Sequence, residues 1–350
     1  MNMDKVHEMA FRVIGDTGGA FTVALGYIGD RLGLFKAMAG AGPMNSAELA
    51  KKTQLNERYV REWLRAMTAA EYVDYDPATQ KYNMTEEQAF VLANEDSPLF
   101  VGGALHFTSP SIRNVDKIAE AFKKGGGIPY SEIGDEIPHA IERLFRPGYL
   151  NFLTKDWLGS VPGLVDRLNK GATVADIGCG AGQSTVAMGK GFPKAQVLGI
   201  DYHAPSIERA RKLATKEGVK NVEFLQAAAH EIPNGKKYDL VCSFDCIHDM
   251  VDPKATLKAI RNAMAEDGVY IWSEPNASAN AHENRNPVGK MFHSISPLHC
   301  MTVSLAFNGA GLGTVIGEEG ARALAKEAGF SKFEKLPIQH PLNQFFALRK

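Results

Sequence analysis

The stretch Val174-Ala175-Asp176-Ile177-Gly178-Cys179-Gly180-Ala181-Gly182, followed by Gln183-Ser184-Thr185, decides how the second half of the chain folds. A short apolar run ends in an acidic residue, a glycine-dense turn follows, and the next residues can begin a helix. This order predicts a strand, a tight turn and a helix N-terminus. Glycines let a ligand lie against the backbone, where a Cβ atom would block it. A dinucleotide-binding turn needs a third glycine at the sixth position, where this chain has Gln183.

A second acidic residue strengthens the prediction of a ligand site. The run Ala195-Gln196-Val197-Leu198-Gly199-Ile200 predicts another strand, which ends at Asp201. In a βαβ unit, a carboxylate at this point can accept hydrogen bonds from both hydroxyls of a ribose. A glycine turn alone is a weak signal, but the turn, a helix of fitting length and this acid are together fairly specific. The alternative is a tight turn that binds no ligand.

The composition is that of a globular protein with room for two domains. The chain has 350 residues, of which 45% are hydrophobic, 39 are basic and 40 are acidic, so a polyanion-binding surface is not expected. The four cysteines form no C-x-x-C pair. We therefore expect a reducing, cytoplasmic location. The N-terminus lacks a signal-peptide core and no run approaches about 20 apolar residues, so no membrane association is expected.

The first 40 residues predict two helices that are interrupted near Gly15–Gly19. The second helix, residues 21–38, carries a broad apolar stripe formed by Val23, Leu25, Ile28, Leu32, Leu34 and Phe35. Such a stripe is broad for a surface helix. We therefore expect part of it to bury against a second copy of the chain, which makes a homodimer.

Two helices and a hairpin then follow in the order of a winged-helix domain. Ser46 and Asn56 are the expected N-caps of helices over residues 47–52 and 57–70, and residues 72–75 and 81–84 predict the hairpin. Between Ser46 and Met84 six basic residues oppose six acidic ones. A neutral face cannot supply the phosphate contacts that provide most DNA affinity. We favour a structural or dimerisation module without nucleic acid, with DNA binding as the alternative.

From residue 172 onward, strands and helices alternate, which predicts an α/β fold. We expect strands at 173–177, 196–200, 222–226, 238–243, 268–273, 332–338 and 344–349, and helices at 183–190, 205–217, 253–265 and 318–329. The expected domains are a helical winged-helix dimerisation domain (1–93), a helical connector and substrate lid (94–170), and an α/β domain with a seven-stranded Rossmann-like sheet (171–350). A long insertion at 276–317 is expected to be a lid of that last domain.

With these features the chain resembles the class I S-adenosylmethionine (SAM) methyltransferases that carry an N-terminal winged-helix domain and act on small molecules. The resemblance rests on the glycine turn, on residues 27–33 and 57–64, and on Ile247-His248-Asp249-Met250. It implies a sheet whose last strand is antiparallel and SAM as the cofactor. The glycines would approach the methionine part, Asp201 would hold the ribose and Tyr202 would flank the adenine. The full implied SAM-binding set is Asp176, Gly178, Cys179, Gly180, Gly182, Asp201, Tyr202, Ala228, Ala229 and Phe244.

One position departs from the pattern of such enzymes. After the third strand they usually place an aspartate that accepts from the adenine amino group, but Ala228 aligns there. Either backbone atoms or a neighbour such as Gln226 takes over this contact, or stacking holds the adenine.

The fourth strand is followed by the best catalytic candidates, Asp245, His248 and Asp249. This strand end borders the SAM methyl group in the fold that the resemblance implies. A histidine beside an acid can deprotonate an acceptor hydroxyl or amine. The alternative is that His248 only positions the acceptor or caps the next helix. No spaced His/Cys ligand set accompanies it, so no metal is expected.

Substrate-binding residues are expected in the connector and the insertion, where aromatic, arginine and histidine side chains gather. The candidates are Tyr130, Arg146, Tyr149, His293 and His299. A thioether acceptor needs no base, but its sulfonium product favours aromatic faces and an attached carboxylate favours an arginine. The enzymes that S-methylate 4-methylthio-2-hydroxybutyrate in dimethylsulfoniopropionate synthesis resemble this architecture, which makes that acid the candidate substrate.

Two other functions stay open besides this S-methylation. The first is O- or N-methylation of another small metabolite, with His248 as the base. The second is a SAM-responsive transcription regulator that uses the winged helix. A nicotinamide oxidoreductase is disfavoured by Gln183.

Overall fold

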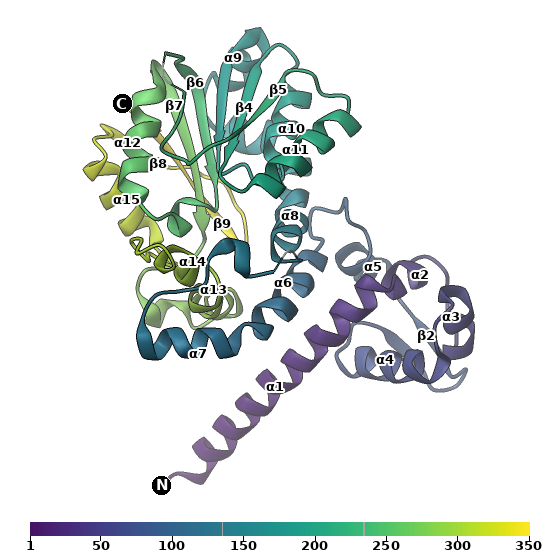
Figure 1. Cartoon of the computed structure of the whole chain (residues 1–350). Coiled ribbons are helices and arrows are strands. Elements are labelled where there is room, and N and C mark those ends of the chain that lie inside the picture. The colour runs from purple at the N-terminus through teal and green to yellow at the C-terminus, as the bar shows by residue number, and fades with distance from the viewer. Residues whose placement is uncertain (135, 234) are drawn as a thin grey trace. The chain divides into compact units, whose positions relative to one another are not determined.

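The computed structural model describes residues 1–134, 136–233 and 235–350 (Figure 1). The chain forms two compact units, Met1–Pro110 with His139–Pro147, and Ser111–Pro138 with Gly148–Lys350. The predicted boundaries at residues 93 and 170 do not follow this division, because α6 (Gly102–Arg113) and α8 (Glu136–Gly148) each run from one unit into the other. Within the described ranges, no helix has both the length and the apolar character that crossing a membrane requires.

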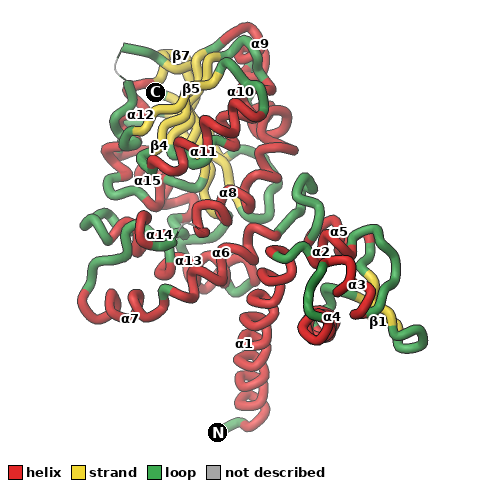
Figure 2. Tube along the Cα trace, turned by 45° about the vertical axis from the view of Figure 1, so that its right-hand side comes forward, coloured by secondary structure: helices red, strands yellow, loops and turns green. Residues whose placement is uncertain are grey.

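The N-terminal unit begins with one long helix, α1 (Met3–Arg31), which is continuous in the cartoon of Figure 1 and in the tube of Figure 2. The predicted interruption near Gly15–Gly19 is wrong. Glycine costs about 1 kcal/mol relative to alanine inside a helix, which weakens a helix without ending it. The chain turns instead at Gly33, whose φ of 72° lies in the left-handed region that glycine adopts freely, and α2 (Leu34–Met38) follows.

The predicted winged-helix pattern is present in this unit. It comprises α3 (Ser46–Thr53), α4 (Glu57–Ala69), β1 (Asp74–Asp76), β2 (Lys81–Asn83) and α5 (Glu86–Leu92). Asn56 caps α4 as predicted, but Asn45 rather than Ser46 caps α3, because Asn45 and Glu48 bond each other's backbone in a capping box. A hydrogen bond connects α4 to α1: Trp63 Nε1 donates to the carbonyl of Leu25 at 2.9 Å.

The C-terminal unit contains the predicted seven-stranded sheet, in the order β5-β4-β3-β6-β7-β9-β8. Strands β5, β4, β3, β6 and β7 are parallel, and β9 pairs antiparallel with both β7 and β8, as the resemblance implied. The strands are β3 (Thr173–Ile177), β4 (Gln196–Asp201), β5 (Val222–Gln226), β6 (Tyr238–Phe244), β7 (Met264–Pro275), β8 (Lys332–Lys335) and β9 (Asn343–Arg349).

Both faces of the sheet are buried, because apolar residues fill successive positions of the central strands. Val174, Leu240 and Ile271 face one core, which includes residues of α9 (Leu164–Gly171) and α10 (Gln183–Gly191). Their neighbours Ala175 and Val241 face the other core, which includes residues of α12 (Pro253–Ala263) and α15 (Gly317–Glu327). Figure 2 shows helices on both sides of the strands, including α11 (Ala204–Lys216). All four helices predicted in this half are therefore confirmed.

The connector and the insertion are mostly helical and meet within the C-terminal unit. The connector contributes α7 (Val115–Lys124), η1 (Tyr130–Glu132), the π-helix η2 (Tyr149–Trp157) and η3 (Leu158–Ser160), and the insertion contributes η5 (Ala281–Asn284), α13 (Pro287–Leu298) and α14 (Cys300–Leu305). Helices α7 and α13 pack together, and the Ile128 N–H donates to Thr302 Oγ1 at 3.0 Å. The two segments predicted as lids therefore support each other.

Candidate functional site

The candidate site lies where the parallel strands β4, β3, β6 and β7 end. The carboxyl ends of neighbouring parallel strands meet at one edge of a sheet, and ligands of open α/β sheets bind there. Strand β4 ends at Asp201, β3 leads into the glycine turn, β6 leads into the short helix η4 (Ile247–Asp249), and Glu274 lies at the end of β7. Residues far apart in sequence are thus brought to one edge.

The glycine turn is held in shape by Asp201. Its Oδ2 accepts from the Gly180 N–H at 2.9 Å and its Oδ1 accepts from the His203 N–H at 2.8 Å. Burial raises the pKa of Asp201, and these two backbone donors oppose the rise. Gly180 has a φ of 51°, and a Cβ atom added there would meet no atom within 4 Å. Open space therefore lies over the turn, beside a carboxylate.

Asp176 is buried beneath the turn. Its Oδ2 accepts from the hydroxyls of Ser184 and Thr185, both at 2.6 Å, so it ties the end of β3 to the first turn of α10. Burial raises the pKa of Asp176 to about 6, although the two hydroxyls act against the rise. The structure gives this predicted cofactor-binding residue a supporting position.

His248 is held between two carboxylates. Its Nδ1 lies 2.5 Å from Glu274 Oε2 and its Nε2 lies 3.2 Å from Asp249 Oδ1, and the ring is only 3% exposed. Trp272 Nε1 donates to the other oxygen of Glu274 at 2.7 Å and so fixes that carboxylate. Because a carboxylate accepts, we assign the Nδ1 proton to the bond with Glu274, which leaves Nε2 as the reactive nitrogen.

The charges around His248 favour its protonated state. Burial acts to lower the pKa of His248, but Glu274 and Asp249 outweigh it and raise the pKa well above its ordinary value. Burial likewise acts to raise the pKa of Asp249, and His248 brings it below its ordinary value. The pair therefore stabilises an imidazolium, the state that a histidine reaches after it has taken a proton.

Asp245, the third predicted catalytic residue, is engaged elsewhere. Asn343 Nδ2 donates to both of its carboxylate oxygens, at 2.6 and 2.7 Å. Its φ of 51° is unusual for a residue other than glycine, and such backbone strain tends to occur at functional sites. Burial and the nearby Glu274 raise the pKa of Asp245 to about 7. This geometry suits a role in shaping the strand end.

Aromatic rings line the site on two sides. Tyr130 of the connector lies with its ring centroid 6.2 Å from Tyr202, 5.1 Å from His203 and 6.0 Å from His299. Burial raises the pKa of Tyr130, so its hydroxyl stays neutral. Three predicted site residues, Tyr130, Tyr202 and His299, are therefore brought together.

A second aromatic group surrounds the end of β6. The ring of Tyr149 lies 5.4 Å from Phe244 and 5.9 Å from Trp157, measured between centroids. Burial, with Asp245 and Asp176 nearby, raises the pKa of Tyr149. Tyr149 and Phe244, predicted as substrate- and cofactor-binding residues, thus lie beside each other.

Two predicted substrate residues have other surroundings. His293 is exposed on α13, outside the groups described above. Arg146 belongs to the N-terminal unit, where Nη1 donates to the carbonyl of Glu95 at 3.0 Å and pairs with Asp96 at 2.7 Å. The guanidinium that was expected to hold a substrate carboxylate is therefore engaged within its own unit.

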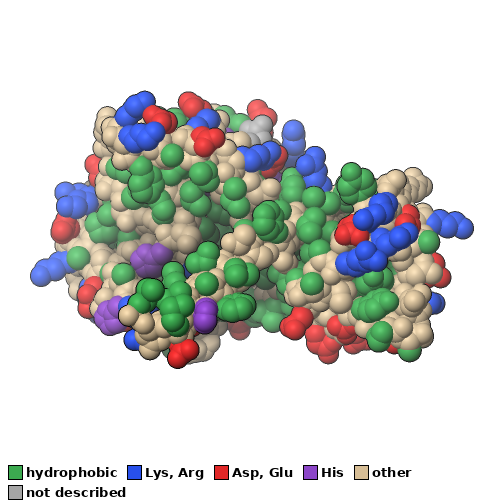
Figure 3. All heavy atoms as spheres, turned by 90° about the horizontal axis from the view of Figure 1, so that it is seen from below, with side chains coloured by type: hydrophobic (Ala, Val, Ile, Leu, Met, Phe, Trp, Pro, Cys, Tyr) green, Lys and Arg blue, Asp and Glu red, His purple; other side chains and the backbone are tan. Residues whose placement is uncertain are grey.

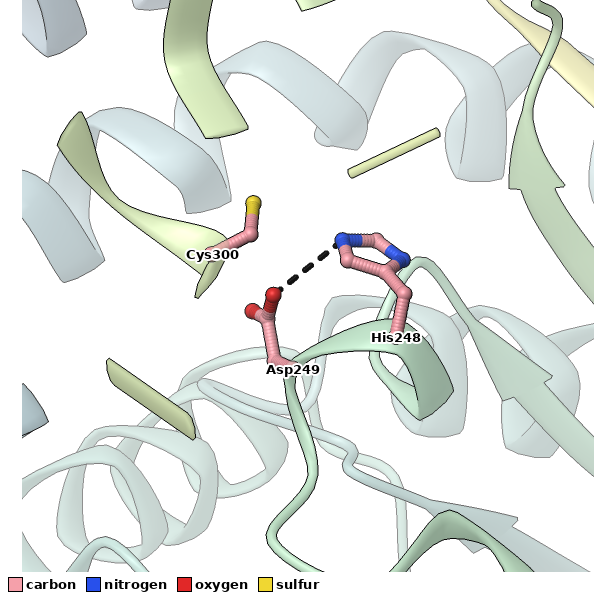
Figure 4. Close-up of side chains that lie close together, drawn as sticks. All are labelled: His248, Asp249 and Cys300. Carbon is pink, nitrogen blue, oxygen red and sulfur yellow. Dashed lines mark ion pairs between the residues drawn. The ribbon is translucent and has the colours of Figure 1, made fainter. Parts of the chain in front are cut away.

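Three relevant residues were missed in the sequence. Glu274 lacked a motif, although a carboxylate at a strand end was a usable signal. Glu231 reaches back to accept from the Ala228 N–H at 3.0 Å, and so places a carboxylate at the position that lacks an aspartate. Cys300 lies beside His248 and Asp249 (Figure 4), and the spacing of these residues in the sequence did not predict that they would be close together.

Two sequence families match the chain. A family described as "Methyltransferase domain" matches residues 168–329, and one described as "Rv2258c-like winged HTH domain" matches residues 19–94. The ubiquinone biosynthesis O-methyltransferase of Acinetobacter baylyi is 29% identical over 151 residues, which are 42% of this chain and 58% of that protein. The protein from Leptothrix cholodnii with the same name is 31% identical over 39% of this chain and 56% of its own. The chain thus spans less than two thirds of these relatives.

Solved structures resemble the chain over nearly its whole length. Human N-acetylserotonin methyltransferase in complex with SAM has a TM-score of 0.73 at 18% identity, with 97% of each chain covered. The mitomycin 7-O-methyltransferase has a TM-score of 0.71 at 20% identity, with 99% of this chain and 100% of that chain covered. At these identities the likeness establishes the fold alone, an α/β domain preceded by a winged-helix domain.

Proposed function

We propose that this chain, which joins a methyltransferase domain to an N-terminal winged-helix domain, transfers the methyl group of SAM to an oxygen or nitrogen atom of a small molecule. The observation that carries the proposal is the His248–Glu274 pair at the end of the sheet, beside the glycine turn. A buried histidine whose Nδ1 is fixed by a carboxylate is built to accept a proton at Nε2.

The residues at the turn fit SAM. Open space over Gly180 leaves room for a ligand against the backbone, and Asp201 places a carboxylate where ribose hydroxyls are expected. Tyr202 is 52% exposed, which leaves part of this residue accessible for a base to stack on. Glu231, which accepts from Ala228, offers an acceptor for the adenine amino group in place of the missing aspartate.

When bound, SAM supplies a methyl group on a positively charged sulfur. The carbon–sulfur bond breaks on transfer, and the sulfur keeps the bonding electrons. The chain's own contribution is to hold the acceptor in line and to take its proton. In its neutral form, His248 Nε2 receives that proton as the new bond to carbon forms, and Glu274 and Asp249, which raise the pKa of His248, stabilise the resulting imidazolium. Asp249 Oδ1 lies 3.2 Å from Nε2 and so occupies the position from which an acceptor hydroxyl would approach that nitrogen. We therefore infer that the Asp249 side chain shifts when the acceptor binds and then helps to orient it.

A thioether carboxylic acid such as 4-methylthio-2-hydroxybutyrate is the second candidate acceptor. The aromatic group formed by Tyr149, Trp157 and Phe244 favours it, since aromatic faces stabilise a sulfonium. Its carboxylate lacks the expected partner, however, because Arg146 pairs with Asp96 and Arg143 pairs with Asp30. A thioether sulfur also carries no proton, so its methylation would not require His248 as a base. We therefore rank oxygen and nitrogen acceptors first.

The alternative function as a DNA-binding regulator is weakened by the second helix of the winged-helix domain. On α4, Arg58 and Arg65 pair with Glu62, and Arg61 pairs with Glu57. In the view of Figure 3, basic, acidic and hydrophobic side chains share the exposed surface. A DNA-binding helix needs unpaired cations facing phosphates, so we propose that this domain is structural and binds no nucleic acid.

The test is a calorimetric titration of SAM into the full chain, followed by a panel of phenols, amines and thioether acids with product detection by mass spectrometry. We expect SAM to bind and one acceptor class with an ionisable proton to be methylated. His248→Ala is expected to lower kcat by roughly 10²–10⁴-fold while SAM affinity stays the same. If only the thioether acid is methylated, and the wild-type protein and His248→Ala methylate it at equal rates, the thioether carboxylic acid would be favoured as the acceptor. Absence of SAM binding would refute both.

A further inference from the structure

Cys300 joins the site from the insertion, outside any motif. It begins α14, with His299 as the preceding cap residue, and its thiol is one of four free thiols in the part of the chain that the structure describes. The ligand-capable atoms of His248, Asp249 and Cys300 all lie within 4.8 Å of one another. In Figure 4 the carboxylate of Asp249 faces the ring of His248, Cys300 lies beside them, and the dashed line marks the His248–Asp249 ion pair.

The surroundings of the three side chains resemble the outer shell of a metal site. Glu274 accepts from His248 Nδ1 and thereby directs Nε2 toward Asp249 and Cys300. A histidine that ligates a metal usually donates a hydrogen bond from its other ring N–H, often to a carboxylate as here. Asp249 Oδ1 is buried, and its neighbours are His248 Nε2 at 3.2 Å and the Cys300 thiol, which are themselves groups that can bind a metal. A buried carboxylate oxygen of this kind suits a cation.

We propose that His248 Nε2, Asp249 and Cys300 Sγ form a binding site for a divalent ion that prefers nitrogen and sulfur ligands, such as Zn²⁺. A mixed nitrogen, oxygen and sulfur donor set favours zinc or cobalt over magnesium or calcium, which prefer oxygen. Three protein ligands leave a fourth tetrahedral position open. Metal–ligand bonds of about 2.0–2.3 Å bring ligand atoms to roughly 3.3–3.8 Å from one another, so closure takes a shift of about 1 Å.

The burial of the group is compatible with metal entry. Cys300 is 5% exposed and His248 is 3% exposed, whereas the side chain of Asp249 is 24% exposed and so provides the approach from solvent. On binding, metal–nitrogen, metal–oxygen and metal–sulfur bonds form, and the protons of Cys300 Sγ and of His248 Nε2 pass to solvent. The lone pair of Nε2 is then used by the metal. One consequence rests on the proposed function: if His248 is the catalytic base, a bound metal occupies its Nε2 and inhibits methylation.

The site itself is tested without SAM or acceptor, using Co²⁺ as the probe. Full-length protein is treated with chelator, transferred to thiol-free buffer and titrated with CoCl₂ while absorbance is recorded. We expect a sulfur-to-cobalt charge-transfer band in the near ultraviolet together with intense visible bands of a tetrahedral centre, and Zn²⁺ should bleach both. Cys300→Ala should abolish the charge-transfer band. Cys242→Ala, which removes another buried thiol outside the group, should retain it.

A second variant tests the outer shell. Glu274→Gln is expected to raise the Kd for Co²⁺ by roughly 10- to 100-fold, with circular dichroism confirming that both variants are folded. The proposal is overturned if the wild-type protein shows no charge-transfer band, or if Cys300→Ala shows the same band as wild type. Because these readouts do not involve methylation, a protein that binds Co²⁺ through Cys300 but methylates nothing refutes only the proposed function.

Discussion

His248 and Glu274 lie 26 residues apart in the chain, yet Nδ1 of one is 2.5 Å from Oε2 of the other. Strands β6 and β7 run parallel as neighbours in the sheet, so their carboxyl ends place η4 beside the last residues of β7. Glu274 is fully buried and its second oxygen accepts from Trp272. The imidazole therefore has one fixed orientation, which a catalytic base requires.

Replacing Glu274 with glutamine should impair catalysis more than binding. The amide keeps the size of the side chain but removes the charge that stabilises the imidazolium. We expect kcat to fall roughly 10- to 100-fold, with little change in KM or in SAM affinity. Steady-state kinetics and calorimetry measure the two effects. Glu266→Gln, on the exposed part of the same strand, is the matched control. Equal kcat in the two variants would show that Glu274 does not act through His248.

Asp201 should determine SAM affinity. Its carboxylate accepts a hydrogen bond from the Gly180 N–H of the glycine turn, and it lies at the position expected for a ribose-binding acid. Hydrogen bonds to a charged group contribute about 1.5–3 kcal/mol, so Asp201→Asn should raise the Kd for SAM roughly 10- to 100-fold. Calorimetric titration measures this change. Glu223→Gln on β5 should bind SAM as the wild type does. An unchanged Kd in Asp201→Asn would place the ribose elsewhere.

The sequence predicted most of the α/β half because its signals there are local. Apolar runs ending in Asp176 and Asp201, and the glycines between them, fixed the strands and the turn to within a few residues. The contacts of Glu274 and Cys300 with His248 depend on the order of strands and on the path of the insertion. Such long-range pairings leave no periodic pattern in one sequence, so they had to come from the structure.

The errors near the N-terminus have a different origin. Three closely spaced glycines predicted a break in α1, but helix propensity is a weak preference that neighbouring residues outweigh. At α3, both Asn45 and Ser46 are good caps, and the choice depended on the reciprocal bond with Glu48. Arg146 was placed with the substrate because of its neighbours in sequence, whereas its ion pair is with Asp96.

Helix α1 should mediate association of two copies of the chain. Val6, Val13, Phe21 and Ile28 recur about every seven residues, lie on one side of the helix and are all exposed. We expect light scattering to give twice the monomer mass. Val13→Glu should shift the protein to monomer, whereas Gly19→Glu adds the same charge on the opposite side and should leave the dimer intact. A monomeric wild-type protein would refute this prediction.

Two glycines of α1 should respond oppositely to alanine. A Cβ atom at Gly29 would lie 2.4 Å from Cζ2 of Trp63, whereas one at Gly18 would meet no atom within 4 Å. Gly29→Ala should therefore lower stability by about 1–3 kcal/mol through overpacking, and Gly18→Ala should raise it by up to about 1 kcal/mol through helix propensity. Thermal unfolding followed by circular dichroism compares them. Equal shifts would mean that Trp63 does not pack closely against α1.

Asp30 links three parts of the N-terminal unit. It pairs with His106 of α6 and with Arg143 of α8, the latter at 2.6 Å, and its side chain is only 4% exposed. Burial acts to raise the pKa of Asp30, but the hydrogen bonds from His106 and Arg143 outweigh it and lower the pKa from 3.8 to about 2. Since the folded pKa is the lower one, the unfolded state binds the proton more tightly.

Stability from Asp30 should therefore be fully present above pH 4 and should be lost as the pH falls toward 2. A shift from 3.8 to about 2 corresponds to roughly 2 kcal/mol of unfolding free energy. Asp30→Asn should be destabilised by at least this amount at pH 7, and its difference from wild type should shrink between pH 4 and pH 2. Thermal unfolding over this pH range measures the difference. Glu120→Gln, which removes an exposed carboxylate of α7, should follow the wild-type curve. A constant difference between Asp30→Asn and wild type at all pH values would show that the ion pairs do not shift the pKa of Asp30.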